Sequence, residues 1–243
     1  MNMRSPSAVP SVDLRALMAP VRDQGQRGTC LAFAVTAAHE VGRSAGSPPE
    51  DLAEEALHWG CKRTDGNWTS GTTFASASTA LGRWGQPLET DWPYDPTHAD
   101  GVAYSPPRAP GGSGWFRSGL RRVSLALADV RTYLDGGTPV LLGLTVFDTL
   151  YRPDAAGYIA DPPPGASTRG RHAVLAVGHR TDELLIRNSW GATWALGGYA
   201  WIGDGYVGAH AGDAWIIDAT AATAGTPGAT HTDLQEGETH GTR

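Results

Sequence analysis

The order of hydrophobic patterns along the chain limits its fold more than any other sequence feature. Apolar residues recur at helical spacing within residues 29–41, 52–59 and 72–84. The apolar runs beyond residue 140 are short and bounded by glycine, proline or aspartate, which is typical of strands. Because helices come first and strands follow, the sequence predicts an α+β protein with two segregated lobes and not an alternating parallel sheet.

Local signals refine this prediction. Thr29 is a candidate N-cap of the first helix, and Ser47 with Glu50 forms a candidate capping box for the second. A third helix is predicted at about 72–84 and a short fourth helix at 124–134. Strands are predicted at 140–147, 173–178, 183–187, 198–202 and 214–217.

Proline and glycine crowd residues 92–119 and predict a loop or linker between the lobes. We expect a helical lobe at about 13–110 and a β lobe at about 111–218, which together form one domain over 1–218. Residues 219–243 are rich in alanine, threonine and glycine without periodicity, so we predict a disordered C-terminal tail.

Charge and cysteine content exclude several classes of protein. The 19 basic and 25 acidic residues give a net charge of −6, which does not favour binding to nucleic acid. No window approaches the ~20 apolar residues that span a bilayer, and the N-terminus lacks a signal-peptide core, so we expect a cytoplasmic protein. Cys30 and Cys61 do not form a disulfide framework or a zinc motif, so we expect free thiols and no metal. Lys62 is the one lysine, which we interpret as compositional bias without functional weight.

Four residues form a candidate constellation for nucleophilic catalysis: Gln24, Cys30, His172 and Asn188. Cys30 stands at a predicted helix start, where free N–H groups favour a thiolate. An imidazolium at His172 stabilises such a thiolate, an amide at Asn188 orients the ring, and an amide at Gln24 stabilises an oxyanion. They lie in the segments Gln24-Gly25-Gln26-Arg27-Gly28-Thr29-Cys30, Arg171-His172-Ala173 and Asn188-Ser189-Trp190-Gly191.

These segments resemble the papain family of cysteine peptidases, over roughly residues 9–218. His172 follows Cys30 by 142 residues and Asn188 follows it by 158. The resemblance implies a papain-like fold with an N-terminal helical lobe, a C-terminal antiparallel β-barrel-like lobe and an active-site cleft between them. It implies a hydrolase that cleaves peptide bonds in a peptide or protein substrate, with no cofactor and no metal.

The resemblance also implies a substrate-binding set. Gly71 follows Ser70 in a segment similar to the glycine segment of the family, where an extended substrate pairs with protein backbone. Thr72, Thr73 and Ala173 would line the pocket for the second side chain before the scissile bond. Trp190 would cover the hydrogen bond between the catalytic histidine and asparagine and is counted with this set.

Three positions depart from the family pattern. Arg27 and Leu31 stand where many members have a cysteine and a tryptophan, and Cys61 has lost the partner of a bridged cysteine. The mature-like segment begins almost at Met1, so we expect a bacterial-type member without a propeptide.

Several alternatives stay open. The same acyl-enzyme could serve a transpeptidase or ligase, or the cleft could belong to a non-catalytic peptide-binding module. An acyl-transferring enzyme that acts on glutamine side chains is a third possibility, which Asn188 disfavours. His179 is a weaker rival of His172, and the oligomeric state is not determined by the sequence. We interpret the other histidines as surface or tail residues, namely His39, His58, His98, His210, His231 and His240.

Overall fold

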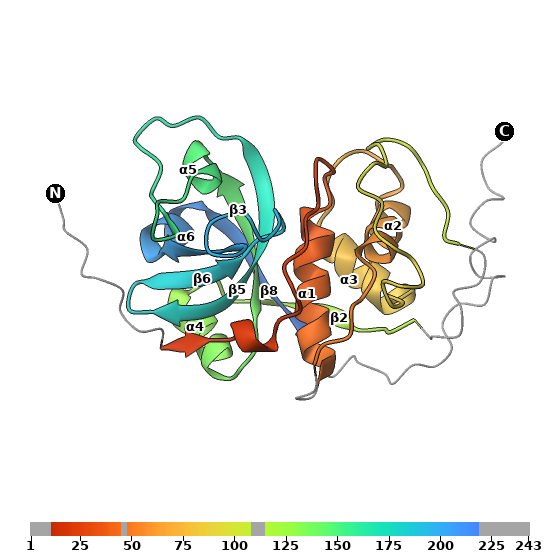
Figure 1. The fold of residues 1–243 in the computed structure, drawn as a ribbon, viewed down its shortest axis with the longest axis horizontal. Coiled ribbons are helices and arrows are strands. Elements are labelled where there is room, and N and C mark those ends of the chain that lie inside the picture. Colours follow the sequence, from red (N-terminus) through yellow and green to blue (C-terminus); the bar gives the residue numbers. More distant parts are fainter. Residues whose placement is uncertain (1–10, 45–47, 108–114, 219–243) are drawn as a thin grey trace.

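The computed structural model describes residues 11–44, 48–107 and 115–218. It has two lobes that lie side by side, one of helices and one built around a sheet (Figure 1). The predicted tail at 219–243, the glycine-rich linker segment at 111–114 and the Ser47 cap lie outside the described residues. The limits predicted for the two lobes stay a prediction.

The helical lobe contains α1 (Cys30–Ser44), α2 (Glu54–Asp65) and α3 (Phe74–Arg83). Thr29 precedes α1, and its carbonyl accepts the first helical hydrogen bond from the Phe33 N–H at 3.2 Å, as an N-cap residue does. Thr73 caps α3, because its hydroxyl accepts a hydrogen bond from the Ser76 N–H at 3.1 Å. The first and third predicted helices are therefore confirmed with small shifts of their ends.

The predicted start of the second helix was wrong. Helix α2 begins at Glu54 after Ala53, which gives it no side-chain cap. Leu52 instead forms an isolated β-bridge with Leu88, and the Ala53 N–H donates to the carbonyl of Pro87 at 3.0 Å. These partners lie more than 30 residues away in sequence, so the local capping signal did not reveal them.

The other lobe is one eight-stranded sheet with the spatial order β2-β8-β3-β5-β6-β7-β4, and β1 pairs with β5 beside this path. Its strands are β1 (Val12–Asp13), β2 (Gly119–Val123), β3 (Val140–Val146), β4 (Tyr158–Ile159), β5 (Gly170–Arg180), β6 (Glu183–Arg187), β7 (Tyr199–Gly203) and β8 (Ala211–Asp218). The remaining elements are η1 (Arg15–Leu17), α4 (Leu127–Asp135), α5 (Asp148–Tyr151) and α6 (Asp204–His210).

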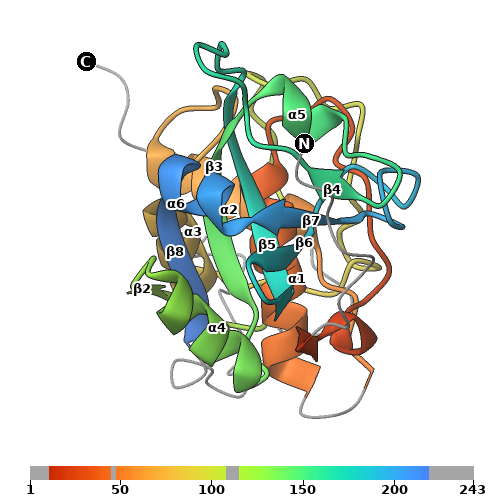
Figure 2. The same ribbon diagram turned by 90° about the vertical axis from the view of Figure 1, so that its left-hand side faces the viewer.

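The sheet is open, which corrects the expectation of an antiparallel, barrel-like lobe. Strands β2 and β4 are the two ends of the pairing path and do not pair with each other, and β4 pairs with β7 in parallel. Helices cover both faces of this sheet: α4 and α6 lie on one side and α1 lies on the other (Figure 2). Because helices already bury both faces, the sheet need not close on itself to form a core.

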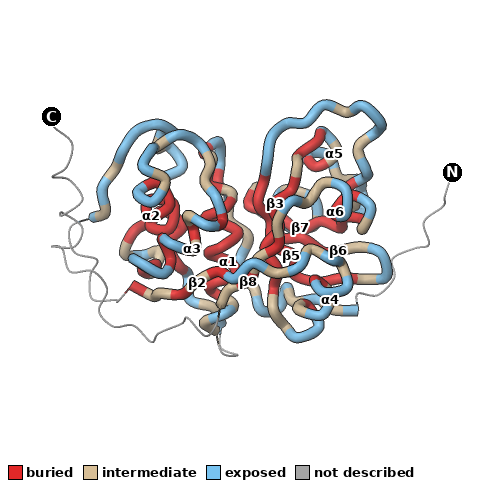
Figure 3. The backbone as a smooth tube through the Cα atoms, turned by 180° about the vertical axis from the view of Figure 1, so that it is seen from behind, coloured by how far each residue is buried: buried red, intermediate tan, exposed pale blue. Residues whose placement is uncertain are grey.

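Strand β5 shows this double burial residue by residue. Ala173, Leu175 and Val177 pack into the core cluster that includes α1, α2 and α3. Val174 and Ala176 point to the opposite face and join the cluster with α4 and α6. The buried parts of the tube in Figure 3 follow this arrangement along α1 and the central strands. The start of β5 is thus held against the N-terminal end of α1, where the candidate site lies.

All five predicted strands are present, as β3, β5, β6, β7 and β8, and β6 spans the predicted residues 183–187. The two-residue strands β1 and β4 and the short helices α5 and α6 were not predicted, because they are too brief for periodicity to indicate. In the part of the chain that the structure describes, no helix is long and apolar enough to cross a membrane.

Candidate active site

Cys30 is the first residue of α1, and its side chain is only partly exposed. Burial opposes ionisation of the thiol, yet the pKa of Cys30 is lowered from its usual 9.0. The causes are a side-chain hydrogen bond with His172, the charge of that ring, and backbone hydrogen bonds with Ala173 and Leu31. Cys30 is therefore poised to form a thiolate.

The orientation of the His172 ring follows from its partners. The Asn188 Oδ1 atom lies 2.8 Å from the Ser189 N–H, which can only donate, so this atom of the amide is the oxygen. The same oxygen lies 2.7 Å from His172 Nε2, so Nε2 must carry a hydrogen. Nδ1 is left for Cys30 and is the nitrogen that can take the thiol proton.

Burial opposes protonation of His172, but its hydrogen bond with Cys30, the charge of a Cys30 thiolate and the hydrogen bond with Asn188 raise the pKa of the ring above 6.5. A lowered cysteine pKa and a raised histidine pKa favour the same state, a thiolate–imidazolium pair. Asn188 is itself buried, with 4% of its surface exposed, so water does not compete for its bond to the ring.

Gln24 is fixed at both ends of its side-chain amide. Its Nε2 donates to the Arg27 carbonyl at 2.7 Å, and its Oε1 accepts from the Ser189 hydroxyl at 2.6 Å. The Gln24 N–H also donates to the Ser189 carbonyl at 2.9 Å. An amide nitrogen has two hydrogens, so Gln24 keeps one for another acceptor.

A groove of about 280 Å³ runs between the lobes beside this cluster. It is lined by Cys30, Leu31, Gly71, Thr72, Thr73, Phe74, Gly143, Arg171, His172, Ala173 and Asp213. Four of the five predicted substrate-binding residues are in this lining, and Trp190 is not. Within the described ranges, no group of three or more histidine, cysteine, aspartate or glutamate residues is arranged to hold a metal ion.

Trp190 packs against the ring of His172 and is not part of the groove lining. Its ring centroid lies 4.8 Å from that of His172 and 5.6 Å from that of Trp194. Tyr151 stacks on Trp190 at 5.0 Å with an interplanar angle of 1°, and 49% of its surface is exposed. The sequence did not indicate Tyr151, because it lies 39 residues before its partner on a short helix.

Arg27 and Glu55 form a buried ion pair behind the loop that leads to Cys30. The Arg27 guanidinium makes two hydrogen bonds to the Glu55 carboxylate, at 2.5 and 2.9 Å. It also donates to the Asp95 carbonyl at 2.6 Å and lies over the ring of Tyr94. Because the Arg27 carbonyl holds the Gln24 amide, this ion pair anchors the predicted oxyanion site to α2.

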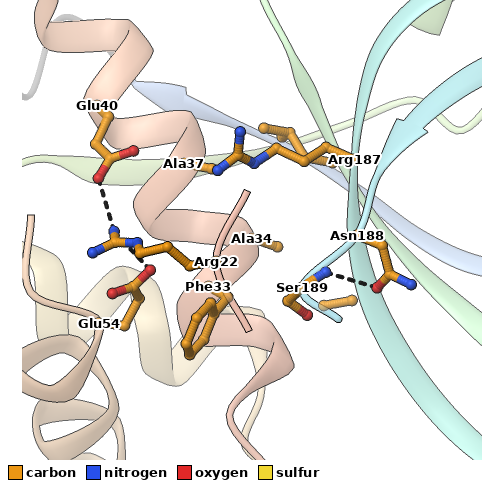
Figure 4. Close-up of a pocket in the computed structure, with 11 residues that line it drawn as sticks. Arg22, Phe33, Ala34, Ala37, Glu40, Glu54, Arg187, Asn188 and Ser189 are labelled. Carbon is orange, nitrogen blue, oxygen red and sulfur yellow. Dashed lines mark hydrogen bonds and ion pairs between the residues drawn. The ribbon is translucent and has the colours of Figure 1, made fainter. Parts of the chain in front are cut away.

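A layer of buried charge lies between the lobes, next to Asn188 and Ser189 (Figure 4). Arg22 contacts Glu40 at 3.0 Å and Glu54 at 2.7 Å. Burial raises the pKa of Glu40 to about 7 and also raises that of Glu54, although Arg22 opposes both shifts. The Gly191 N–H donates to the Arg22 carbonyl at 3.2 Å, so Arg22 links this layer to the segment that follows Asn188.

The remaining histidines correct part of the sequence interpretation. His39 and His58 are buried, and burial lowers the pKa of each to about 4. His39 bonds to Gln86 at 2.8 Å, a partner 47 residues away that the sequence could not indicate. His179 lies within β5, and its Nε2 is 2.8 Å from the Asp135 carboxylate, so it is held away from Cys30 by another partner.

The comparisons with known proteins agree with this geometry. A thiol that is hydrogen-bonded to an imidazole at a groove between two lobes is an arrangement that thiol-dependent acyl-transfer enzymes use. The model of the papain family of cysteine proteases matches residues 8–213, and the chain belongs to this family.

Two curated relatives are identical to the chain at about a quarter of the aligned positions. It is 27% identical over 204 residues to "Cysteine proteinase 3" of Entamoeba histolytica and 26% identical over 187 residues to papain of Carica papaya. These matches cover 79% and 76% of this chain but only 62% and 51% of the two relatives. The chain thus spans between half and two thirds of their length.

Solved structures show the same fold. Xylellain, a cysteine protease from Xylella fastidiosa, has a TM-score of 0.76 at 26% identity, and the match covers 87% of both chains. A cysteine protease from Carica candamarcensis has a TM-score of 0.65 at 23% identity, over 86% of this chain and 98% of the other. The papain-like, two-lobed fold predicted from the sequence is confirmed.

Proposed function

We propose that the protein is a cysteine peptidase that hydrolyses peptide bonds through Cys30, His172, Asn188 and Gln24. The observation that carries this proposal is the chain of contacts from Cys30 to His172 to Asn188. It lowers the pKa of the thiol, raises that of the imidazole and fixes Nδ1 as the nitrogen toward the sulfur.

In this mechanism the Cys30 thiolate attacks the scissile carbonyl carbon, and a sulfur–carbon bond forms. The oxyanion accepts hydrogen bonds from the Cys30 backbone N–H and from the second amide hydrogen of Gln24. His172 then gives its proton to the leaving amine as the carbon–nitrogen bond breaks. Water, deprotonated by His172, attacks the thioester, and the acid leaves with return of the thiolate.

The groove beside Cys30 supports binding of an extended peptide on the amino-terminal side of the scissile bond. Gly71, Thr72, Thr73 and Ala173 would contact this part of the substrate. Trp190 would contribute from behind His172, where its ring shields the bond to Asn188 from water. The proposed reaction uses groups of the chain itself and water, so we propose no metal and no organic cofactor.

The test is covalent labelling with an epoxysuccinyl peptide under reducing conditions at neutral pH, followed by peptide mapping. We expect one adduct, on Cys30, together with cleavage of a peptide library that Cys30→Ala abolishes. An unlabelled Cys30 would favour a non-catalytic peptide-binding module. A Cys30→Ala protein with activity within about tenfold of the unchanged protein would reject Cys30 as the nucleophile. Added amine nucleophiles that give ligated products in place of acids would indicate a transpeptidase.

A further inference from the structure

The one lysine of the chain lies directly behind the substrate groove. The other 18 basic residues are arginines, so a lysine at position 62 stands apart. Its side chain is 1% exposed, and its Nζ donates to the Gly71 carbonyl at 2.5 Å and to the Asp65 carboxylate at 2.9 Å. A compact ammonium can serve both acceptors at once, whereas the wide guanidinium fork of arginine needs more room.

Lys62 itself is held in place by the end of α2. Its carbonyl accepts a hydrogen bond from the N–H of Gly66, the left-handed residue that caps the helix. The Asp65 carboxylate is the counter-charge: burial opposes its ionisation, but hydrogen bonds with Ser76 and Lys62 hold the pKa of Asp65 below 3.8. The Lys62 ammonium is thus fixed in position and can hold a backbone carbonyl of the segment that follows α2.

The residue that Lys62 holds in this way is Gly71. It has a φ of +77°, and a Cβ added there would meet no atom within 4 Å, so its Cα borders open space in the groove. On its other side, a Cβ on Gly28 would lie 2.7 Å from the Gly71 nitrogen. Gly71 is therefore packed against the loop before Cys30, while its carbonyl points to the buried ammonium.

We infer that Lys62 is a positioning residue for peptide substrates: by binding the Gly71 carbonyl it sets the backbone of the groove wall that receives the substrate beyond its first residue. This inference rests on the proposed peptidase function. It corrects the interpretation of the lysine as compositional bias, because the side chain is buried and both of its partners are specific. Lys62 does not touch the thiol or the imidazole, so it should affect binding of long substrates and not the chemical step.

The test compares two esters with the same leaving group and the same residue at the scissile bond. One is a single amino-acid ester, and the other extends that residue by three more toward the amino terminus. We expect Lys62→Met to raise the KM of the peptide ester about tenfold with kcat within about twofold. The kcat/KM of the amino-acid ester should stay within about twofold of the unchanged protein.

Three variants control this comparison. Arg63→Met removes a charge from the exposed neighbour on the same helix and should change neither ester. Lys62→Arg keeps the charge without the compact geometry and should reproduce most of the KM effect. Lys62→Met with Asp65→Asn removes both charges, so it leaves no partly buried carboxylate without a counter-charge. This double variant should show the same split between the two esters if the single variant is unstable.

Equal losses on both esters, or no loss on either, would overturn the role of Lys62 while the unchanged protein still turns over both. An unchanged protein that hydrolyses neither ester, or no better than Cys30→Ala, would instead reject the peptidase function and this inference with it.

Discussion

The two cysteines of this chain differ in almost every property that decides reactivity. Cys30 begins α1 at the edge of the groove, and its pKa is lowered by His172 and by neighbouring backbone groups against the opposing effect of burial. Cys61 lies inside α2 with none of its surface exposed, and burial together with the charge of Asp65 raises its pKa to about 12. Both are free thiols.

The comparison teaches that position within a helix and one neighbouring imidazole ring separate a thiol that ionises readily from a thiol of the core. A helix N-terminus offers unbonded N–H groups to a thiolate, whereas a thiol in the helix interior meets satisfied backbone and apolar side chains. Four substitutions test this contrast.

The largest effect should come from His172→Ala, which removes the partner that makes Cys30 differ from an ordinary thiol. We expect kcat/KM to fall by at least about 10³-fold, with the fold intact. Alkylation of Cys30, measured against pH by peptide mapping, should shift its midpoint upward toward 9.0 because the lowering influence is gone. A midpoint that does not move would show that the histidine does not set the thiol pKa.

Gln24→Ala should separate thiol reactivity from turnover. Loss of one oxyanion donor typically lowers kcat by about 10²–10³-fold, and KM should change much less. The alkylation rate of Cys30 should stay near that of the unchanged protein, since Gln24 is not among the groups that shift the thiol pKa. An equal loss of alkylation and turnover would place Gln24 in support of the loop alone.

Asn188→Ala should cost less than His172→Ala, on the order of ten- to a hundredfold in kcat, because the contact of the ring with Cys30 survives. The hydrogen bond with Asn188 helps to raise the pKa of His172, so its loss lowers that pKa. The alkaline limb of the pH–rate profile should therefore move to lower pH. The reverse ranking of the two variants would mean that the orienting residue has been misassigned.

Cys61→Ala should have the smallest effect on activity, with kcat/KM within about twofold. Thermal unfolding should register the lost side-chain volume in the core as a destabilisation of about 1–2 kcal/mol. Mass analysis after alkylation of the folded unchanged protein should find one modified cysteine, and two after unfolding. Rapid modification of Cys61 in the folded state would contradict its burial.

The sequence was sufficient where a signal is local or where several residues recur in a fixed order. The strand at 183–187 and the start of the first helix after Thr29 follow from neighbours in sequence, and the order of Cys30, His172 and Asn188 pointed to the family. It was insufficient where a partner comes from elsewhere in the fold. Nothing in the sequence near Leu52 indicates its partner Glu40, whose carboxylate accepts a hydrogen bond from the Leu52 N–H at 3.0 Å. Leu52 lies where the sequence predicts the second helix, but α2 begins only at Glu54.

The site shows the same division. The residue types and their spacing predicted which side chains meet near the groove, but they did not predict the buried residues that hold the surrounding loops in place. From the sequence, Arg27 is only a position where many family members have a cysteine. Its ion pair with Glu55 forms because the loop before α1 lies against α2, and the sequence does not indicate this contact. The role inferred for Lys62 depends on its hydrogen bond to the Gly71 carbonyl, nine residues later in the sequence, and the sequence alone did not indicate this bond.

The buried Arg27–Glu55 pair also bears on how the protein can be handled. A thiol nucleophile works only while it is kept reduced, and the reductant that protects it also opens disulfides. Dithiothreitol and glutathione do not break an ion pair. The loop that carries Gln24 therefore stays bound to α2 under the conditions that keep the Cys30 thiol reduced. Strong reducing buffer should therefore sustain this active site without loosening its support.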